Sequence, residues 1–195
     1  MTSRERVRAA LHHRQPDRVP LDLGSTPVTG IHASTYTRLR EALGYPKARA
    51  QVGEPFQMLA DLDPEVADRL GVDTAPVQLA STLFGFPNTN WKPFRLFDGT
   101  EALVSEFFNF TTDTNGDLLM YPNGDLRAPP CARMPKDGNF FDAIVRQESD
   151  AEEHLDPREF AAQQISRYTD EQLGFLQKQA DELLRQTDKS LVGCW

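Results

Sequence analysis

The stretch that decides the fold is Arg18-Val19-Pro20-Leu21-Asp22-Leu23-Gly24, and Ser25-Thr26-Pro27-Val28-Thr29-Gly30-Ile31-His32 follows it. It begins as a short apolar run and ends at a glycine, which is typical of a buried strand. A polar loop with a second glycine comes next, and a helix-like segment follows. Strand, loop and helix in this order predict an α/β fold. Because ligands bind where loops leave the carboxyl ends of such strands, the first candidate site is residues 25–32.

Composition narrows the classes of function. The formal net charge of −8 argues against a nucleic-acid partner, which requires a basic surface. No run of about 18 apolar residues occurs, so no membrane span is expected, and the charged N-terminus does not fit a signal peptide. The two cysteines, Cys131 and Cys194, lie far apart and form no metal-binding pair, which indicates reduced thiols and a cytoplasmic protein.

Local signals predict further elements along the chain. They predict helices that begin at Thr2, Asp63, Asp156 and Thr169, a helix over Ser34–Leu43, one or two helical turns over Phe56–Leu62, an exposed acidic segment over Ser149–Leu155, and strands over Val72–Leu79 and Ser190–Trp195. Leu173, Leu176, Ala180, Leu183 and Leu184 form the best helical stripe and predict a core face.

Residues 81–134 differ from this pattern, because they are rich in aromatic residues, Pro, Asn and Gly. They predict an antiparallel hairpin, with strands over 103–112 and 118–121 joined by a tight turn at Asn115-Gly116. We therefore expect one domain over residues 1–195, with residues 81–134 as a hairpin and loop excursion within it.

Two segments at the N-terminus, Met1–Val7 and His13–Asp22, resemble the start of uroporphyrinogen decarboxylase-like proteins. That superfamily includes cobalamin-dependent methyltransferases that act on coenzyme M and related acceptors. Segments similar to the methyltransferase branch are Pro55–Ala60, Arg69–Asp73, Asn90–Phe94 and Asn115–Asp117. The resemblance covers the N-terminal half of a family member. It implies an α/β fold that is the N-terminal part of a distorted (β/α)8 barrel, because a complete barrel has about 250 residues.

The resemblance also implies a function. True uroporphyrinogen decarboxylases carry an arginine-rich segment after the first strand, which binds the substrate's carboxylates. The corresponding loop, Gly24–Gly30, contains no arginine. This favours a corrinoid-dependent methyltransferase-type enzyme that acts on a small-molecule substrate with a corrinoid protein as partner. Two alternatives stay open: a porphyrinogen decarboxylase, and a non-catalytic truncated remnant.

The cofactors implied by the resemblance are zinc, which activates a thiol, and a corrinoid methyl donor. In the family the zinc ligands are a His-x-Cys and a distant Cys of the C-terminal half. We therefore expect no metal ligand and no cofactor in this portion. Cys131 is expected to be structural, and no catalytic residue is assigned.

Two loops carry the candidate substrate-binding residues, because loops after successive barrel strands rise on the same face. The candidates are Ser25, Thr26, His32, Asn88, Asn90 and Trp91. Trp91 would form an apolar wall, and the others would orient a ligand through polar groups. Each residue also has a structural explanation, such as a place at the start of a helix for His32. Asp61, Asp63 and Asp68 resemble a carboxylate cluster, but Asp63 is better explained as a helix N-cap.

Overall fold

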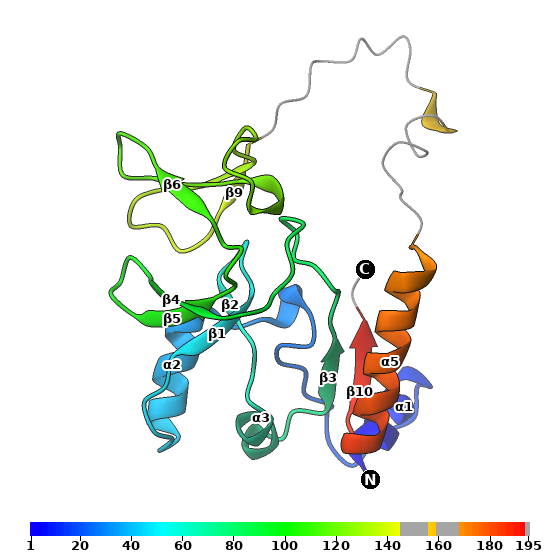
Figure 1. The fold of residues 1–195 in the computed structure, drawn as a ribbon. Coiled ribbons are helices and arrows are strands. Elements are labelled where there is room, and N and C mark those ends of the chain that lie inside the picture. The colour runs from blue at the N-terminus through cyan, green and yellow to red at the C-terminus, as the bar shows by residue number, and fades with distance from the viewer. Residues whose placement is uncertain (145–155, 159–167, 194–195) are drawn as a thin grey trace.

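In the computed structural model, residues 1–144, 156–158 and 168–193 are described, and they form helices and three small sheets (Figure 1). The helices are α1 (Ser3–Leu11), α2 (Ala33–Ala42), α3 (Pro64–Leu70) and α5 (Asp170–Gln186), with 3-10 turns η1 (Pro27–Thr29) and η2 (Pro122–Gly124). The strands are β1 (Ala50–Glu54), β2 (Leu59–Ala60), β3 (Thr74–Val77), β4 (Lys92–Arg95), β5 (Glu101–Val104), β6 (Phe110–Thr112), β7 (Leu118–Met120), β8 (Ala132–Met134), β9 (Asp142–Ala143) and β10 (Ser190–Gly193).

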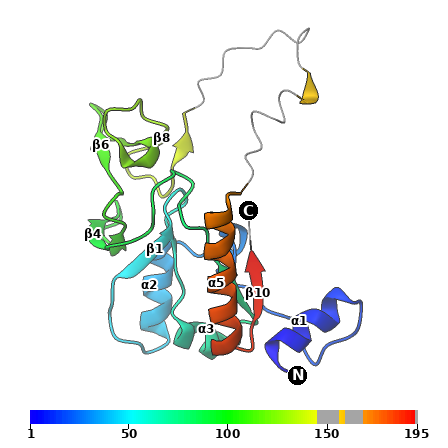
Figure 2. The same ribbon diagram turned by 45° about the vertical axis from the view of Figure 1, so that its right-hand side comes forward.

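The three sheets have separate strand orders. The first sheet is β2-β1-β5-β4, the second pairs β10 with β3, and the third is β6-β7-β8-β9. Helix α2 packs against the first sheet, whereas α5 packs against β3 and β10 (Figures 1 and 2). None of the helices in the described ranges is long and apolar enough to cross a membrane.

The prediction of the N-terminal part of a distorted (β/α)8 barrel is wrong. In the described part of the chain the strands form three small, mostly antiparallel sheets, with no closed barrel and no repeating strand–helix pattern. The parallel pairings there are those of β1 with β5 and of β10 with β3. The prediction failed because apolar runs between turn signals identify strands without identifying which strands pair.

The stretch 18–24 is not a strand, although it was predicted to be the first one. It runs beside the start of β3, where the backbone N–H of Asp73 donates to the carbonyl of Leu21 at 2.8 Å. Pro20 has no N–H to donate to a strand ladder. The Asp73 carboxylate holds the segment instead, because it accepts hydrogen bonds from the Leu21 N–H and from the guanidinium of Arg18.

Asp73 is the centre of a buried ionic cluster. Its side chain is fully buried, and Arg6 and Ser3 from α1 also donate to it, at 2.6 and 2.8 Å. Burial alone would raise the pKa of Asp73, but the donors from Leu21, Ser3, Arg18 and Arg6 outweigh it and hold the pKa at about 2. The cluster therefore ties α1 and the stretch 18–24 to β3.

The helix ends follow the local signals. Thr2 and Thr169 form the predicted capping boxes of α1 and α5. Helix α3 follows Asp63 and ends at Gly71, whose φ of +71° is a left-handed conformation that glycine adopts without strain. In the predicted stripe on α5, Leu176 is buried, whereas Leu173 and Leu184 are exposed. That stripe is thus a core face only in part.

Two other predictions differ from the structure or fall outside it. Residues 56–62 contain a turn and β2, which pairs with β1, rather than helical turns. The predicted acidic segment Ser149–Leu155, most of the predicted helix from Asp156 to Tyr168, and Cys194 and Trp195 lie outside the described residues.

Residues 81–134 contain the predicted hairpin, formed by β6 and β7 with Phe110 opposite Met120. They also contain β4 and β5, which join β1 in the first sheet. The strand predicted over 103–112 is therefore divided between β5 and β6. An aromatic cluster packs the first and third sheets together: the ring of Phe108 lies 5.2–6.5 Å from those of Phe86, Phe94, Phe110 and Phe141.

Candidate ligand-binding cavity

A cavity of about 460 Å3 is lined by several distant chain segments. They are the loop before α2, the end of β1, β2 with the residue after it, the end of β3, and the loop between β3 and β4. Tyr168, just before α5, completes the lining. The cavity wall combines apolar side chains with a small number of polar ones, which is typical of small-molecule sites.

Three of the six predicted site residues line this cavity: Ser25, Thr26 and Asn88. Ser25 is buried, and its hydroxyl has no hydrogen-bond partner in the described part of the chain. Thr26 Oγ1 lies 3.3 Å from the hydroxyl of Thr29. The Asn88 side-chain amide donates to the carbonyl of Gly53 at 2.7 Å, while its Oδ1 is buried and without a partner among the residues described.

The other three predicted residues, His32, Asn90 and Trp91, are not among those that line the cavity. His32 is the N-cap of α2: its Nδ1 accepts from the Ser34 N–H at 3.3 Å, and its Nε2 lies 3.0 Å from the carbonyl of Asn139. Asn90 is exposed and donates to Glu106 at 2.6 Å. Trp91 directly precedes β4. Both ring nitrogens of His32 thus contact the protein itself, which agrees with a structural role at the start of α2.

Asp61 is a carboxyl group of the cavity wall, and it is not among the predicted site residues. It follows β2, is half-buried, and its Oδ1 accepts a hydrogen bond from Gln78 Nε2 at 2.9 Å. Burial raises the pKa of Asp61 to about 6, and the negative charge of Asp63 adds to the effect. Gly53 gives Asp61 its space, because a Cβ at that position would clash with the carboxylate.

Glu54 is the second carboxyl group of the wall. Its two oxygens accept from the backbone N–H groups of Phe56 and Gln57, at 2.9 and 2.8 Å. Burial raises its pKa as well. No Lys, Arg or His side chain is among the described residues that line the cavity, so the cavity is acidic.

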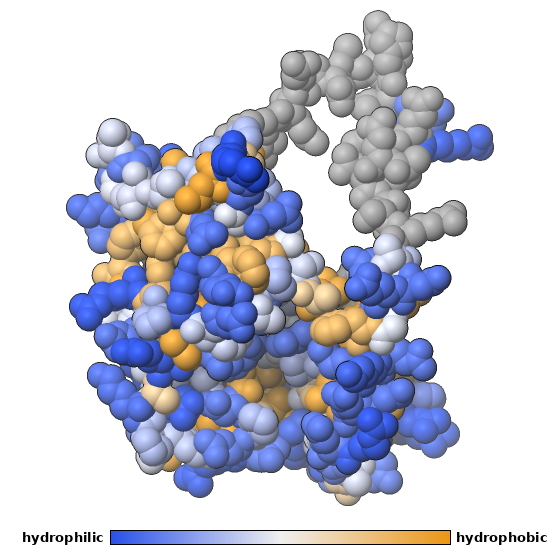
Figure 3. All heavy atoms as spheres, in the orientation of Figure 1, coloured by the Kyte–Doolittle hydropathy of each residue, from blue (hydrophilic) through white to orange (hydrophobic). Residues whose placement is uncertain are grey.

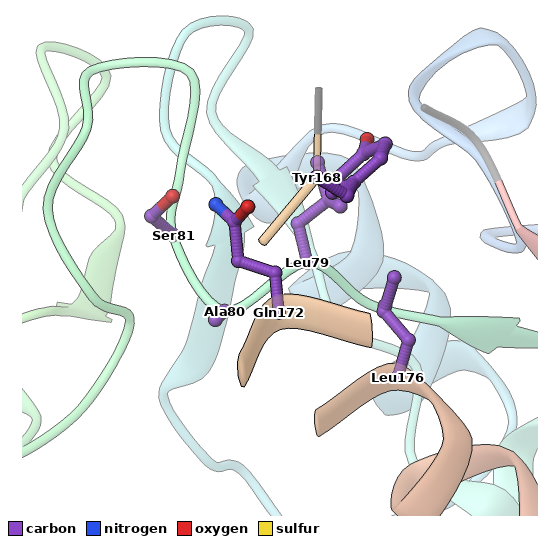
Figure 4. A pocket seen from close by; sticks show the side chains of 6 residues that line it. All are labelled: Leu79, Ala80, Ser81, Tyr168, Gln172 and Leu176. Carbon is purple, nitrogen blue, oxygen red and sulfur yellow. The ribbon is translucent and has the colours of Figure 1, made fainter. Parts of the chain in front are cut away.

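A smaller pocket of about 70 Å3 adjoins the cavity and shares Leu79, Ser81 and Tyr168 with it. Figure 4 shows that Gln172 and Leu176 of α5, and Tyr168 just before this helix, face the segment 79–81. Gln179 of α5 accepts from the backbone N–H of Gln78 at 2.5 Å. Helix α5 is therefore hydrogen-bonded to the residue that contacts Asp61.

Exposed apolar residues lie beside the cavity. Apolar atoms gather near the upper end of α5 and on the body beside it, whereas the lower outer surface is hydrophilic (Figure 3). Leu79 and Leu83, two lining residues, are 38% and 71% exposed. Exposed apolar side chains beside a cavity are buried when a ligand binds, which adds to its affinity.

The donor set for a zinc ion is not present in the part of the chain that the structure describes. No three His, Cys, Asp or Glu side chains gather there as metal ligands. The residues described therefore do not fit the zinc that the family resemblance implies. Cys131 lies outside the cavity wall, with its thiol 3.6 Å from the carbonyl of Met120.

Comparisons with family models, with curated proteins and with solved structures found no match to this chain. The resemblance to uroporphyrinogen decarboxylase-like proteins thus stays a prediction. The chemistry of the cavity is the more direct guide to function.

Proposed function

We propose that the cavity binds a small organic substrate, and that the chain is the substrate-binding portion of a corrinoid-dependent methyltransferase-type enzyme in the cytoplasm. The observation that carries the proposal is a cavity of about 460 Å3 whose wall is apolar apart from a few polar groups. Small-molecule sites have volumes of roughly 300–1,000 Å3 and this kind of lining. The N-terminal segments 1–7 and 13–22 support the choice of enzyme class by their resemblance.

Each polar residue has a role in this proposal. Ser25 and Asn88 orient the substrate through the hydroxyl and Oδ1 that lack partners in the described structure. Asp61, with its pKa raised by burial to about 6, exchanges a proton with a bound molecule near neutral pH. The corrinoid methyl donor would be carried by a separate protein, and no step of the reaction is assigned to zinc on these residues.

The alternative, porphyrinogen decarboxylation, fits the cavity less well. A porphyrinogen carries several carboxylates, which proteins bind with arginine side chains. The described lining contains Asp61 and Glu54 and no cationic side chain. Like charges brought together in a binding site oppose association. The acidic wall therefore favours the methyltransferase-type substrate over the porphyrinogen.

Calorimetric titration of the full chain with three probes of one shape, benzylamine, benzyl alcohol and benzoate, tests whether the cavity is a ligand site. At least one probe should bind, and Ser25→Ala should weaken it by about fivefold, the effect of one lost hydrogen bond of about 1 kcal/mol. Ser25→Ala should not destabilise the fold, because the deleted hydroxyl has no partner among the described residues. Asn90→Ala, outside the cavity wall, is the control.

Absence of binding by all three probes, or an equal loss with Asn90→Ala, would refute a ligand site here. A second assay tests catalysis: transfer of the methyl group of methylcob(III)alamin to the bound probe, with cob(I)alamin as the leaving group, followed by the change in corrinoid absorbance. A chain that binds a probe but supports no transfer favours the alternative of a non-catalytic binding portion over an enzyme that is active by itself.

A further inference from the structure

We infer that the ligand of this cavity is a small organic cation, a protonated amine on an apolar skeleton, and that Asp61 is the group that binds its charge. The inference rests on the proposed function, because it takes the cavity as a ligand site. It goes further by fixing the charge and the chemical class of the ligand.

The first observation is that Asp61 has no cationic partner in the described structure. It accepts one neutral hydrogen bond, from Gln78, and the charged group that acts on it is Asp63, which is also negative. Arg40 is occupied by its ion pair with Asp63. An ionised carboxylate in a desolvated position is unfavourable unless a positive charge accompanies it. A cationic ligand in the cavity would supply that charge.

The second observation concerns hydrogen bonding. The hydroxyl of Ser25 and Oδ1 of Asn88 are buried without partners within the described ranges, and both residues line the cavity. The amide nitrogen of Asn88 already donates to Gly53. Oδ1 can only accept, and a hydroxyl can do so. An ammonium group with several N–H bonds can donate to both of these acceptors at once.

The third observation is the apolar part of the wall. Leu59 and Val77 are buried there, and Leu79, Leu83 and Tyr168 are exposed. These side chains can pack against a hydrocarbon skeleton, and the burial of apolar surface contributes about 25 cal/mol per Å2 to the free energy of binding. The face of an aromatic ring such as that of Tyr168 also attracts a cation.

Two other ligand classes fit less well. A carboxylate or sulfonate would meet two acidic side chains, Asp61 and Glu54, and no cation of the described lining. A divalent metal ion needs more ligands than one free carboxylate, and both oxygens of Glu54 are engaged by backbone N–H groups. The amine is the class that satisfies both the charge and the hydrogen bonds.

The three benzyl probes distinguish these classes, because they share a skeleton and differ in charge. At pH 8, we expect benzylamine to bind at least about tenfold more tightly than benzyl alcohol, and benzoate to bind most weakly. Asp61→Asn should abolish the preference for benzylamine and leave the affinity for benzyl alcohol unchanged. Asp137→Asn is the matched control, because Asp137 is exposed and lies outside the cavity wall.

The outcomes separate the two proposals. If benzyl alcohol or benzoate binds as tightly as benzylamine, the cavity is a ligand site but the ligand is not a cation. If none of the probes binds, the proposed function fails. If the preference survives Asp61→Asn, another group binds the amine and the role of Asp61 is wrong. The ranking of probes by the wild-type chain decides the ligand class even where a variant fails to fold.

Discussion

Replacing Asp61 with asparagine should stabilise the ligand-free protein at neutral and alkaline pH. Asp61 is half-buried, and within the described ranges it receives one hydrogen bond, from Gln78, which Oδ1 of an asparagine would still accept. Burial raises the pKa of Asp61 to about 6 in the folded chain. In the unfolded chain the pKa is about 3.9. The ionised side chain is thus less favourable in the folded than in the unfolded state.

The pKa difference sets the sign and size of the effect. Between pH 4 and 6 the folded state binds more protons than the unfolded state, so the free energy of unfolding falls as the pH rises through this window. The difference of about two pH units corresponds to an upper limit of about 3 kcal/mol above pH 6. Because Asp61 keeps some contact with solvent, we expect Asp61→Asn to raise the free energy of unfolding by about 1–2 kcal/mol at pH 8.

Urea unfolding followed by circular dichroism at pH 4.5, 6, 7 and 8 measures this effect. The stability difference between Asp61→Asn and the wild type should be small at pH 4.5 and reach its full value above pH 7, whereas Asp137→Asn should track the wild type throughout. A variant that is less stable than the wild type at pH 8, or a difference that does not change with pH, would refute the claim that Asp61 is ionised at a free-energy cost.

Two further substitutions test the packing of the fold, each by urea unfolding. Asp73→Ala should lower the free energy of unfolding by about 3–5 kcal/mol, because it leaves the guanidiniums of Arg6 and Arg18 without their buried partner. Since the pKa of Asp73 is about 2, the stabilisation by Asp73 should be complete above pH 4 and decline towards pH 2. A loss below about 1 kcal/mol would contradict the role given to the cluster. Phe108→Ala should cost about 3–5 kcal/mol, because its ring is fully buried in the aromatic cluster, whereas Phe107→Ala, at a position 37% exposed, should cost much less; equal losses would show that the cluster is not the core.

Local structure was predictable where neighbouring residues determine it. The helix starts at Thr2 and Thr169 depend on a side chain and a residue three positions later, so the sequence shows them directly. The hairpin of β6 and β7 is similar, because Gly116, with a φ of +88°, permits the turn between them. Such features need no knowledge of distant contacts.

The arrangement of the strands was not predictable in this way. Strand β1 pairs with β5, about fifty residues later, and β10 pairs with β3 over more than a hundred residues. Nothing in the hydrophobic pattern of either strand identifies its partner. The strand predicted over 18–24 is wrong for a related reason. This stretch is held by the charged side chain of Asp73, which an apolar pattern does not reveal.

The cavity was predictable in part. Ser25, Thr26 and Asn88 lie on polar loops, and this position in the sequence is what predicts them as substrate-binding residues. The sequence pattern places Asp61 only in a carboxylate cluster, and the position of Asp61 within the apolar run 56–62 is the signal that could identify it. A lone carboxylate among apolar residues is either exposed or strongly perturbed, and only the structure tells which.

The contrast between Asp73 and Asp61 explains why one is structural and the other is assigned to ligand binding. Both are desolvated, yet burial is outweighed at Asp73 by donors from Arg6, Arg18 and other groups, whereas Asp61 has one amide donor. Environments that push the pKa values of two like groups apart indicate different roles. Asp73 is fully paired within the chain, so an added partner would gain nothing there. Asp61 lines the cavity and has no cationic partner among the described residues, and a cation that enters this cavity would offset the unfavourable free energy of its desolvated charge.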